Sequence, residues 1–354
     1  MSEKEVLLQL TSDHLNTGMR GVPVGTCRTS FVTPTEGVHY CGYPITELAS
    51  FAPEDIVYLL FNKELPTPEQ SKEIRAEISS RAAIPGDLEP VLKALPTDGH
   101  PMDWLSVGIH TLGMFETTND WRTDAMNLIA RMPRLMGLLF RIRDGRSENI
   151  PADDPSASMV DRFVNTLDIE GVDKAKMTRI ISTYLVLHMD HGGGNLSTFT
   201  GKAIASGHAT VYSSMAGAMN ALSGPLHGRA NQSCLEFVLR IGTSDPVKVE
   251  AFVRAELEAK RPVFGFGHAV LRTEDPRATV QFALGQEVCP DDENFKIIRT
   301  LREVAPRVLR ENPKISNPNA NVDIASGALL HHIGLTDPTY YTTFFGWARV
   351  AGIG

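Results

Sequence analysis

The sequence predicts an all-α fold that carries one short β-hairpin near its N-terminus. Two observations support this prediction: apolar residues recur at helical spacing in several long segments, and short stretches rich in glycine or proline separate those segments. A chain of 354 residues also exceeds what a single hydrophobic core usually supports. We therefore expect two domains that pack closely, because no flexible linker interrupts the sequence.

The hairpin is expected in residues 25–45, where the pattern differs from the rest of the chain. Runs of β-forming residues at 27–32 and 38–41 flank a turn that contains Pro34 and Gly37. This segment holds the only convincing β signal of the sequence.

The segment from Asp173 to Asp190 is predicted to be a helix. Its apolar stripe consists of Met177, Ile180, Ile181, Tyr184 and His188. We expect the helix to stop at Gly192, Gly193 and Gly194, because a run of glycines destabilises a helix.

Three later segments are also predicted to be helical or buried. The stripe of residues 208–222 (Val211, Met215, Ala218, Leu222) alternates with small residues, so this helix is expected to approach a neighbour closely, in a bundle or at a subunit interface. Residues 292–311 show the same period through Phe295, Ile298, Leu301, Val304 and Val308, with a kink expected at Pro306. Residues 336–354 are apolar and aromatic.

Composition excludes several classes of protein. The formal net charge of -8 argues against a general surface for nucleic acid or anionic lipid, so local arginines must meet any anionic ligand. Four widely spaced cysteines without a CxxC pair suggest reduced thiols rather than a zinc knuckle or a disulfide framework. The N-terminus resembles neither a signal peptide nor a transit peptide, and no window reaches membrane-spanning length. A cytoplasmic protein is expected.

Histidines that neighbour glycine or proline are the strongest signals of chemistry. His191, His227 and His268 each lie where a helix is expected to begin or end, and the glycines around them let a ligand approach the backbone. Imidazoles at helix ends suit acid–base work, because their pKa values lie near neutrality. The alternative for each ring is a helix cap or a buried side chain without chemistry.

A metal site at His188, Asp190 and His191 is a further alternative, because imidazole and carboxylate groups ligate zinc or iron. Their spacing differs from the i, i+4 histidine pair of the HExxH motif. We therefore expect no metal site there, and place His188 on the core face of its helix.

Charged residues near the later histidines have two interpretations each. Arg272 and Arg277 follow His268 and are shaped to grip a carboxylate or phosphate, or they form a solvated, salt-bridged turn with Glu274 and Asp275. For Asp323, the default interpretation is a side chain that caps a helix. The pair Gly265 and Gly267 is too short for a dinucleotide-binding fingerprint.

These stretches together resemble the citrate synthase family, in particular its mitochondrial-like branch. The matching segments are HMDHGGGNLSTFT, AMNALSGPLHGRANQ, FGFGHAVLRTEDPR, NVDIASGALL and YYTTFFGWARVAGIG, with GVPVGTC and YCGYPITELA near the N-terminus. They occur in the family's order and cover nearly the whole chain.

The resemblance implies an acyltransferase of the tricarboxylic acid cycle that condenses acetyl-CoA with oxaloacetate. The family's catalytic residues match His227, His268 and Asp323, and its oxaloacetate-binding residues match His191, Arg277 and Arg349. The CoA contacts match the loop 263–267 (Val263, Gly265, Gly267) and Arg272. The resemblance implies acetyl-CoA as a co-substrate and no metal or tightly bound cofactor.

The same resemblance implies an architecture with an active-site cleft between a large helical domain, residues 1–226, and a smaller helical domain, residues 227–334. Residues 335–354 would return to the large domain, with hinges near residues 224–228 and Gly334. A homodimer is expected, in which the helix at 208–222 matches the family's interface. Family members continue for several dozen residues beyond the point that matches Gly354, and that tail carries an arginine that reaches the neighbouring subunit's site; a chain that ends at Gly354 would hold oxaloacetate less firmly.

Three alternatives stay open at this point. A 2-methylcitrate synthase would take propionyl-CoA, which differs by one methylene group and therefore by roughly 1–3 kcal/mol in an apolar pocket. A non-catalytic acyl-CoA-binding homologue would explain a missing tail. A metal-dependent hydrolase at His188, Asp190 and His191 would bind metal stoichiometrically.

Overall fold

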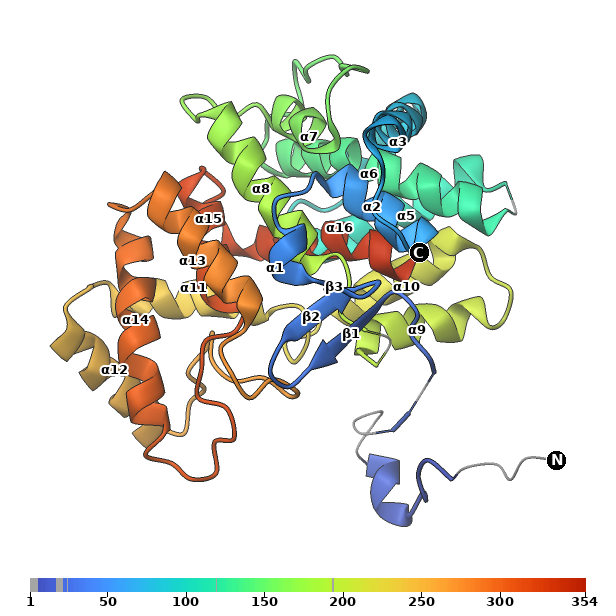
Figure 1. Ribbon diagram of the computed structural model, residues 1–354. Helices are drawn as coiled ribbons and strands as arrows, with labels where there is room; N and C mark the ends of the chain where they lie inside the picture. Colours follow the sequence, from blue (N-terminus) through green and yellow to red (C-terminus); the bar gives the residue numbers. More distant parts are fainter. Residues whose placement is uncertain (1–5, 17–21, 24, 119, 193) are drawn as a thin grey trace.

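The fold is all-α, as the sequence predicts, and helices account for most of the chain (Figure 1). The computed structural model describes residues 6–16, 22–23, 25–118, 120–192 and 194–354. Part of the predicted GVPVGTC match and the middle glycine of the run at 192–194 lie outside these described residues. None of the helices in the described ranges is long and apolar enough to cross a bilayer.

The predicted hairpin is present and has a third strand. Strand β1 (Ser30–Thr33) pairs antiparallel with β2 (Gly37–Tyr40), and β2 pairs with β3 (Tyr43–Pro44). The turn between β1 and β2 packs on a distant segment, because the carbonyl of Pro34 accepts the backbone N–H of Arg272 at 2.8 Å. The hairpin therefore touches the loop that carries His268.

The chain up to residue 222 forms one group of helices. Its elements after a short 3-10 helix η1 (Ser12–Asn16) are α1 (Ile45–Leu48), α2 (Pro53–Asn62), α3 (Pro68–Arg81), α4 (Leu88–Lys93), α5 (Pro101–Glu116), α6 (Trp121–Arg143), α7 (Met159–Leu167), α8 (Lys174–His188), α9 (Leu196–Ala205) and α10 (Val211–Leu222). The later helices are α11 (Ala230–Ile241), α12 (Pro246–Glu258), α13 (Pro276–Val288), α14 (Glu293–Leu309) and α15 (Asp323–His332), which gather at the left of Figure 1. After the 3-10 turn η2 (Pro338–Tyr340), α16 (Tyr341–Ile353) runs back through the middle of the first group.

Many helices begin at a residue whose side chain accepts a backbone N–H of the first turn, which satisfies a donor that the helix itself leaves unpaired. These caps are Thr67, Asp120, Ser158, Asp173, Asn195, Thr210, Asp245, Asp275 and Asp292. The sequence signals that start the helices are therefore local.

The predicted helices are confirmed, with one error at an end. Every residue of the stripe in α8 is buried, but α8 ends at His188 and not at the glycines beyond it. Helix α14 continues through Pro306 to Leu309. The close approach predicted for α10 is made within the chain: a Cβ added to Gly217 would lie 2.1 Å from Ile204 of α9, and one added to Gly113 of α5 would lie 2.5 Å from Tyr212. The proposed interface role of α10 stays a prediction, as do the domain boundaries at 226/227 and 334/335.

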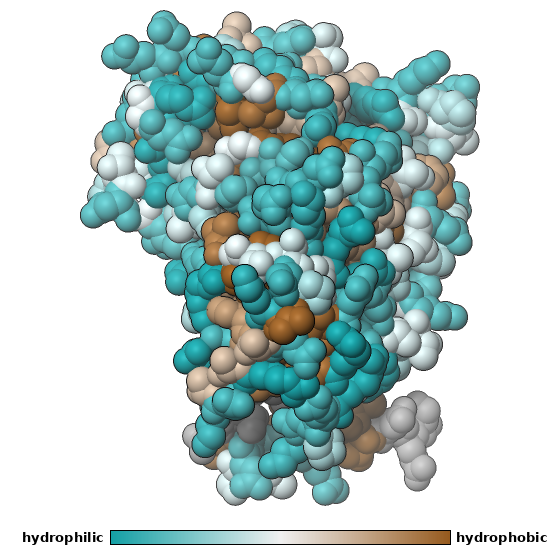
Figure 2. Space-filling model, turned by 90° about the vertical axis from the view of Figure 1, so that its left-hand side faces the viewer, coloured by the Kyte–Doolittle hydropathy of each residue, from teal (hydrophilic) through white to brown (hydrophobic). Residues whose placement is uncertain are grey.

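The core surrounds α16, whose buried aromatic residues pack against α6, α7 and α8. Phe344 and Trp347 contact the ring of Phe163, with ring centroids 5.4 and 5.2 Å away. This packing fixes α16 in the middle of the molecule, where it also carries Arg349. The face that bears the later helices is mainly hydrophilic, with hydrophobic side chains in small separate patches (Figure 2).

Candidate active site

The predicted site residues come from different elements and act on one another electrostatically. Arg277, at the start of α13, is close enough to His191, His268 and Asp323 to shift their pKa values. Arg349, on α16, does the same to His191 and to His227 in the turn before α11. The fold therefore gathers these side chains around two buried guanidinium groups, although they are spread over much of the sequence.

His227 is held in one tautomer by the N-terminus of α9. The backbone N–H of Ser197 donates to Nε2 of His227 at 3.2 Å, and the Ser197 hydroxyl oxygen lies 3.0 Å from the same atom. Because a backbone N–H can only donate, Nε2 is unprotonated and the neutral ring carries its proton on Nδ1. Burial first, and Arg349 second, lower the pKa of His227 to about 4. His227 is thus a neutral ring whose Nδ1–H is available as a donor.

His268 is held in the opposite tautomer by its own loop. Its Nδ1 accepts the backbone N–H groups of Val270 at 3.0 Å and Leu271 at 2.9 Å. The proton of the neutral ring therefore lies on Nε2. Burial and the nearby Arg277 lower the pKa of His268. The His268 ring faces that of His191, with ring centroids 5.4 Å apart.

Asp323 is the first residue of α15, and its carboxyl group does not cap that helix. The structure gives α15 no side-chain cap, and it is the side chain of Asn321 that accepts the N–H of Asp323 at 3.0 Å. The default interpretation of Asp323 as a helix cap is wrong. Loss of water around the partly buried carboxyl raises its pKa to about 6, against the opposing effect of Arg277. A carboxyl with this pKa can work as a base near neutrality.

Short hydrogen bonds tie the loop before His268 to the loop before Asp323. Asn321 donates its backbone N–H to the carbonyl of Gly265 at 2.9 Å and its side-chain amide to the carbonyl of Gly267 at 2.9 Å. Gly267 donates in turn to the carbonyl of Asn319 at 3.0 Å. These hydrogen bonds join the two loops and fix the position of His268 relative to Asp323.

Arg277 forms a buried ion pair with Asp275 rather than part of a solvated turn. Nε and Nη2 of Arg277 donate to the Asp275 carboxylate at 3.0 and 2.7 Å. Both side chains are almost fully buried. Burial opposes the charge of Arg277, yet its carboxylate partner keeps the pKa of Arg277 above the ordinary value. Glu274 pairs instead with Arg302.

Arg349 is buried on the other side of the site, beside His188. Its Nε donates to the carbonyl of His188 at 3.0 Å, and its guanidinium lies over the ring of Phe345 at 4.7 Å. His188 is itself buried: its Nδ1 lies 2.7 Å from the carbonyl of Tyr184, and its ring stacks on that residue. The prediction that His188 belongs to the core face is confirmed.

The residues matched to CoA binding lie at the edge of the same loop. Val263 is partly buried, and Gly265 and Gly267 both have positive φ angles, of 82° and 83°. The guanidinium of exposed Arg272 turns back and donates to the carbonyls of Val270 and Leu271 at 3.0 and 2.9 Å. The loop thus exposes the cation of Arg272 and leaves Gly267 partly exposed, whereas Gly265 is buried.

The arrangement can perform a specific kind of chemistry. Two neutral imidazoles present N–H donors, a carboxyl group with a raised pKa can take a proton, and two buried guanidinium groups can hold carboxylates. Such a set suits removal of a proton from a weak carbon acid, with a donor at each developing oxyanion. In the described ranges, no group of three histidine, cysteine, aspartate or glutamate side chains is placed to hold a metal ion.

Sequence reasoning missed the side chains that orient the site. Ser197 and Asn321 act through backbone and amide groups, which carry no signal of their own type in the sequence. Asp275 was visible beside Arg277, but its burial was not. An aspartate two residues before an arginine, with a proline between them, is the one signal that was available.

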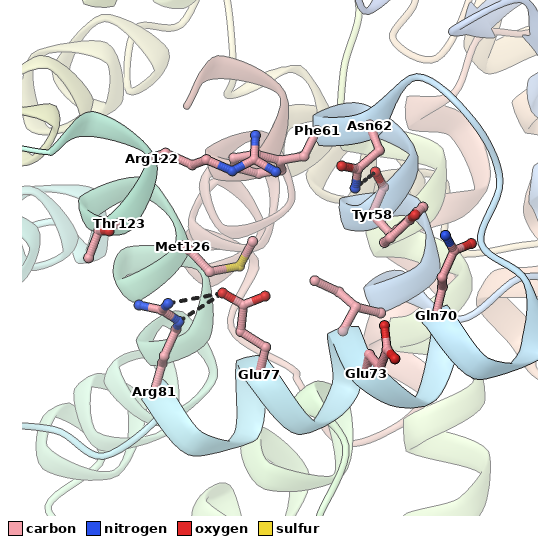
Figure 3. A pocket seen from close by; sticks show the side chains of 11 residues that line it. Tyr58, Phe61, Asn62, Gln70, Glu73, Glu77, Arg81, Arg122, Thr123 and Met126 are labelled. Carbon is pink, nitrogen blue, oxygen red and sulfur yellow. Dashed lines mark hydrogen bonds and ion pairs between the residues drawn. The ribbon is translucent and has the colours of Figure 1, made fainter.

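A groove between α2, α3 and α6 lies away from these residues (Figure 3). It encloses about 290 Å³, and its lining includes Tyr58, Phe61, Arg122 and the ion pair between Glu77 and Arg81, whose Nη2 and Oε1 atoms are 3.0 Å apart. None of the predicted site residues lines it. The candidate active site is therefore the cluster around Arg277 and Arg349, and this groove is separate from it.

Comparison with known proteins identifies the family. The family model described as "Citrate synthase, C-terminal domain" matches residues 18–354. The chain is 35% identical over 379 residues to a mitochondrial 2-methylcitrate synthase of Yarrowia lipolytica, covering 98% of this chain and 81% of that protein. It is 33% identical over 379 residues to a mitochondrial citrate synthase of Daucus carota, covering 99% and 79%. The crystal structure of citrate synthase from Thermotoga maritima superposes with a TM-score of 0.83 at 29% identity, covering 95% of this chain and 89% of that chain.

Proposed function

This chain belongs to the citrate synthase family, and from that premise we propose that it condenses acetyl-CoA with oxaloacetate and hydrolyses the product thioester to citrate and CoA. Family membership makes it an acyltransferase. The choice of acyl group and the role of each residue are the parts that we propose.

The first step in this proposal is removal of a proton from the acetyl methyl group. Asp323 takes the proton, because its pKa of about 6 leaves it ionised at neutral pH yet basic enough to act. The Nδ1–H of His227 donates to the thioester oxygen as it gains enolate charge. Neutral His227 suits this task, since its low pKa shows that the site disfavours a second ring proton.

The second step joins the two substrates. The enolate carbon attacks the ketone carbon of oxaloacetate, the carbonyl π bond breaks, and the new alkoxide takes the proton from Nε2 of His268. The proton that Asp323 took from the methyl group balances this transfer, and its return to His268 restores the neutral ring. Because Asp275 occupies Nε and Nη2 of Arg277, we assign Nη1 to one substrate carboxylate. Arg349 uses Nε for His188 and offers Nη1 and Nη2 to the other carboxylate. His191 completes this subsite. Water then hydrolyses the citryl thioester: its oxygen bonds to the acyl carbon, the C–S bond breaks, and CoA leaves as the free thiol.

The opposite tautomers of His227 and His268 carry the proposal. Two donors that face two different oxyanions need rings protonated at different nitrogens, and separate backbone N–H groups impose this. The test measures release of free CoA thiol from acetyl-CoA, with and without oxaloacetate, for the wild type and Asp323→Asn. Release that depends on oxaloacetate and falls by about 10²- to 10⁴-fold in the variant supports the proposal. Release without oxaloacetate, or an unimpaired variant, contradicts it.

A 2-methylcitrate synthase is the second candidate, because a relative with that name matches as well as the citrate synthases do. The two reactions share every step above and differ by one methylene group on the acyl chain. The ratio of kcat/KM for acetyl-CoA and propionyl-CoA decides between them. A preference of more than tenfold for propionyl-CoA would replace acetyl-CoA in our proposal.

The proposal extends to CoA and to assembly. We assign the CoA moiety to the loop of Val263, Gly265 and Gly267 with Arg272, and the reaction as written needs no tightly bound cofactor. A homodimer and a cytoplasmic location stay predictions. Light scattering coupled to size exclusion measures the former directly.

A further inference from the structure

Asp190 is a buried carboxylate next to His191, and the proposed mechanism gives it no task. Only 2% of Asp190 is exposed. Its Oδ1 accepts the backbone N–H of His191 at 2.7 Å, and its own N–H donates to the hydroxyl of Tyr40 on β2 at 3.1 Å. Tyr40 donates in turn to the carbonyl of Val186 at 3.0 Å. Asp190 thus fixes the peptide unit that carries His191.

The residues at the start of the hairpin bind the other oxygen of this carboxylate. The hydroxyl of Thr29 donates to Oδ2 of Asp190 at 2.5 Å. Next to it, the hydroxyl of Ser30 accepts the backbone N–H of Gly192 at 2.6 Å. Two consecutive hydroxyls of the hairpin therefore bind the residues on both sides of His191.

Helix α16 closes the junction from a third direction. A Cβ added to Gly352 would lie 2.3 Å from the carbonyl of Met189 and 2.8 Å from Cβ and Cγ of Asp190, so the helix backbone rests on this carboxylate. Arg349 lies one turn earlier on α16. Burial lowers the pKa of Arg349, and the nearby Asp190 carboxylate acts in the opposite direction and raises it. Asp190 therefore connects the two elements that supply His191 and Arg349.

We propose that Asp190, anchored by the hydroxyl of Thr29, is a positioning residue that sets the oxaloacetate end of the site by fixing His191 against Arg349. This inference rests on the proposed function. It gives Asp190 no contact with the substrate, because both Asp190 oxygens already accept hydrogen bonds inside the protein. Loss of the Thr29 hydroxyl frees the carboxylate to turn, which loosens His191 while the acetyl-CoA end stays intact.

The experiment compares Thr29→Val with Thr29→Ser and with a matched control, Thr33→Val. Valine keeps the shape of threonine and removes the hydroxyl, and serine restores the hydroxyl. The control residue Thr33 lies at the end of β1, where its hydroxyl accepts the backbone N–H of Glu36 at 2.9 Å. Calorimetry measures oxaloacetate affinity without acetyl-CoA, and steady-state kinetics measures both KM values. We expect roughly tenfold weaker oxaloacetate binding and a similar rise in its KM for Thr29→Val. The KM for acetyl-CoA stays within about twofold, and Thr29→Ser and Thr33→Val behave like the wild type.

The inference is overturned if Thr29→Val binds oxaloacetate as tightly as the wild type does. It is also overturned if Thr29→Val raises the KM for oxaloacetate and the KM for acetyl-CoA by the same factor. A wild type that neither binds oxaloacetate nor releases CoA overturns the proposed function instead. If Thr29→Val does not fold, Ser30→Ala replaces it in the same measurements. This variant removes the hydroxyl that accepts the backbone N–H of Gly192, and the same results support or overturn the inference.

Discussion

Ser197 directs its backbone N–H at Nε2 of His227 across 3.2 Å, although 30 positions separate the two residues in the sequence. A neutral His227 protonated at Nδ1 is therefore expected from pH 8 down to the region of its pKa, which burial and Arg349 lower to about 4. Ring ¹⁵N chemical shifts of histidine-labelled protein, assigned with His227→Gln, report this directly. Ser197→Ala keeps the backbone donor and should leave the tautomer unchanged. A ring protonated at Nε2, or one that titrates near its ordinary pKa, would contradict the assignment.

The raised pKa of Asp323 predicts an acid limb in the activity profile. Because the base must be ionised, kcat/KM should fall tenfold for each pH unit below about 6, with one proton involved. The measurement is the initial rate of CoA release at low substrate between pH 5 and 9. A rate that stays level down to pH 5 would show that the carboxyl is not desolvated as the structure places it. Glu256 is a useful comparison, since its pKa is lowered by Arg261 and its variant Glu256→Gln should keep the wild-type limb.

The same desolvation predicts that Asp323→Asn is more stable than the wild type at alkaline pH. A carboxyl whose folded pKa is raised favours the folded state only while it is protonated, and that advantage is lost as pH rises through the folded pKa of about 6. With about 1.4 kcal/mol for each pKa unit, the ionised group costs on the order of 2–3 kcal/mol. Denaturant unfolding at pH 8 should show this gain for Asp323→Asn, and at pH 4 the two proteins should be equally stable. A variant that is less stable at pH 8 would rule out the desolvation account.

The helices could be predicted from sequence wherever one face is apolar and the start is capped locally. The stripe of α8 and its cap at Asp173 are of this kind. The end of α8 was misplaced because it depends on distant partners: Tyr40 and Thr29 bind Asp190 and draw the chain out of the helix before the glycines are reached. For the same reason, the residues next to Asp323 in the sequence suggested a helix cap. Its environment is made by loops around residue 265 and by Arg277, which local pattern does not bring together.

The burial of His188 predicts a loss of stability in acid. Burial first, and Arg277 second, lower the pKa of His188 to about 3, far below its ordinary value of 6.5. A depressed folded pKa stabilises the protein fully above pH 6.5, and this contribution is lost as pH falls toward 3, because the unfolded chain binds the extra proton. His188→Phe keeps a flat ring against Tyr184 and cannot titrate. Its free energy of unfolding should fall less steeply than that of the wild type between pH 6 and 4, by up to about 1.4 kcal/mol for each pH unit. Parallel slopes would show that His188 is protonated in the folded state.

Gly265 and Gly267 offer a matched pair for the loop that carries His268. Both have nearly the same positive φ, 82° and 83°, so an alanine at either position meets a similar backbone cost of about 1–2 kcal/mol. Their surroundings differ. A Cβ at Gly265 would lie 2.9 Å from Sγ of Cys234 and 3.0 Å from Cβ of Ile324, whereas one at Gly267 would meet only the carbonyl of Asn317 at 3.5 Å.

Because Ile324 follows Asp323 directly, the clash at Gly265 pushes the loop of His268 away from the proposed base. Gly265→Ala should therefore lose more stability than Gly267→Ala, by about 1–3 kcal/mol, as overpacking does. It should also lose kcat, since the distance between His268 and Asp323 changes. Thermal unfolding and single-turnover kinetics measure the two effects separately. If both alanine variants lose the same stability and the same kcat, backbone strain alone accounts for the loop, and the close packing of Gly265 on Cys234 and Ile324 does not position His268.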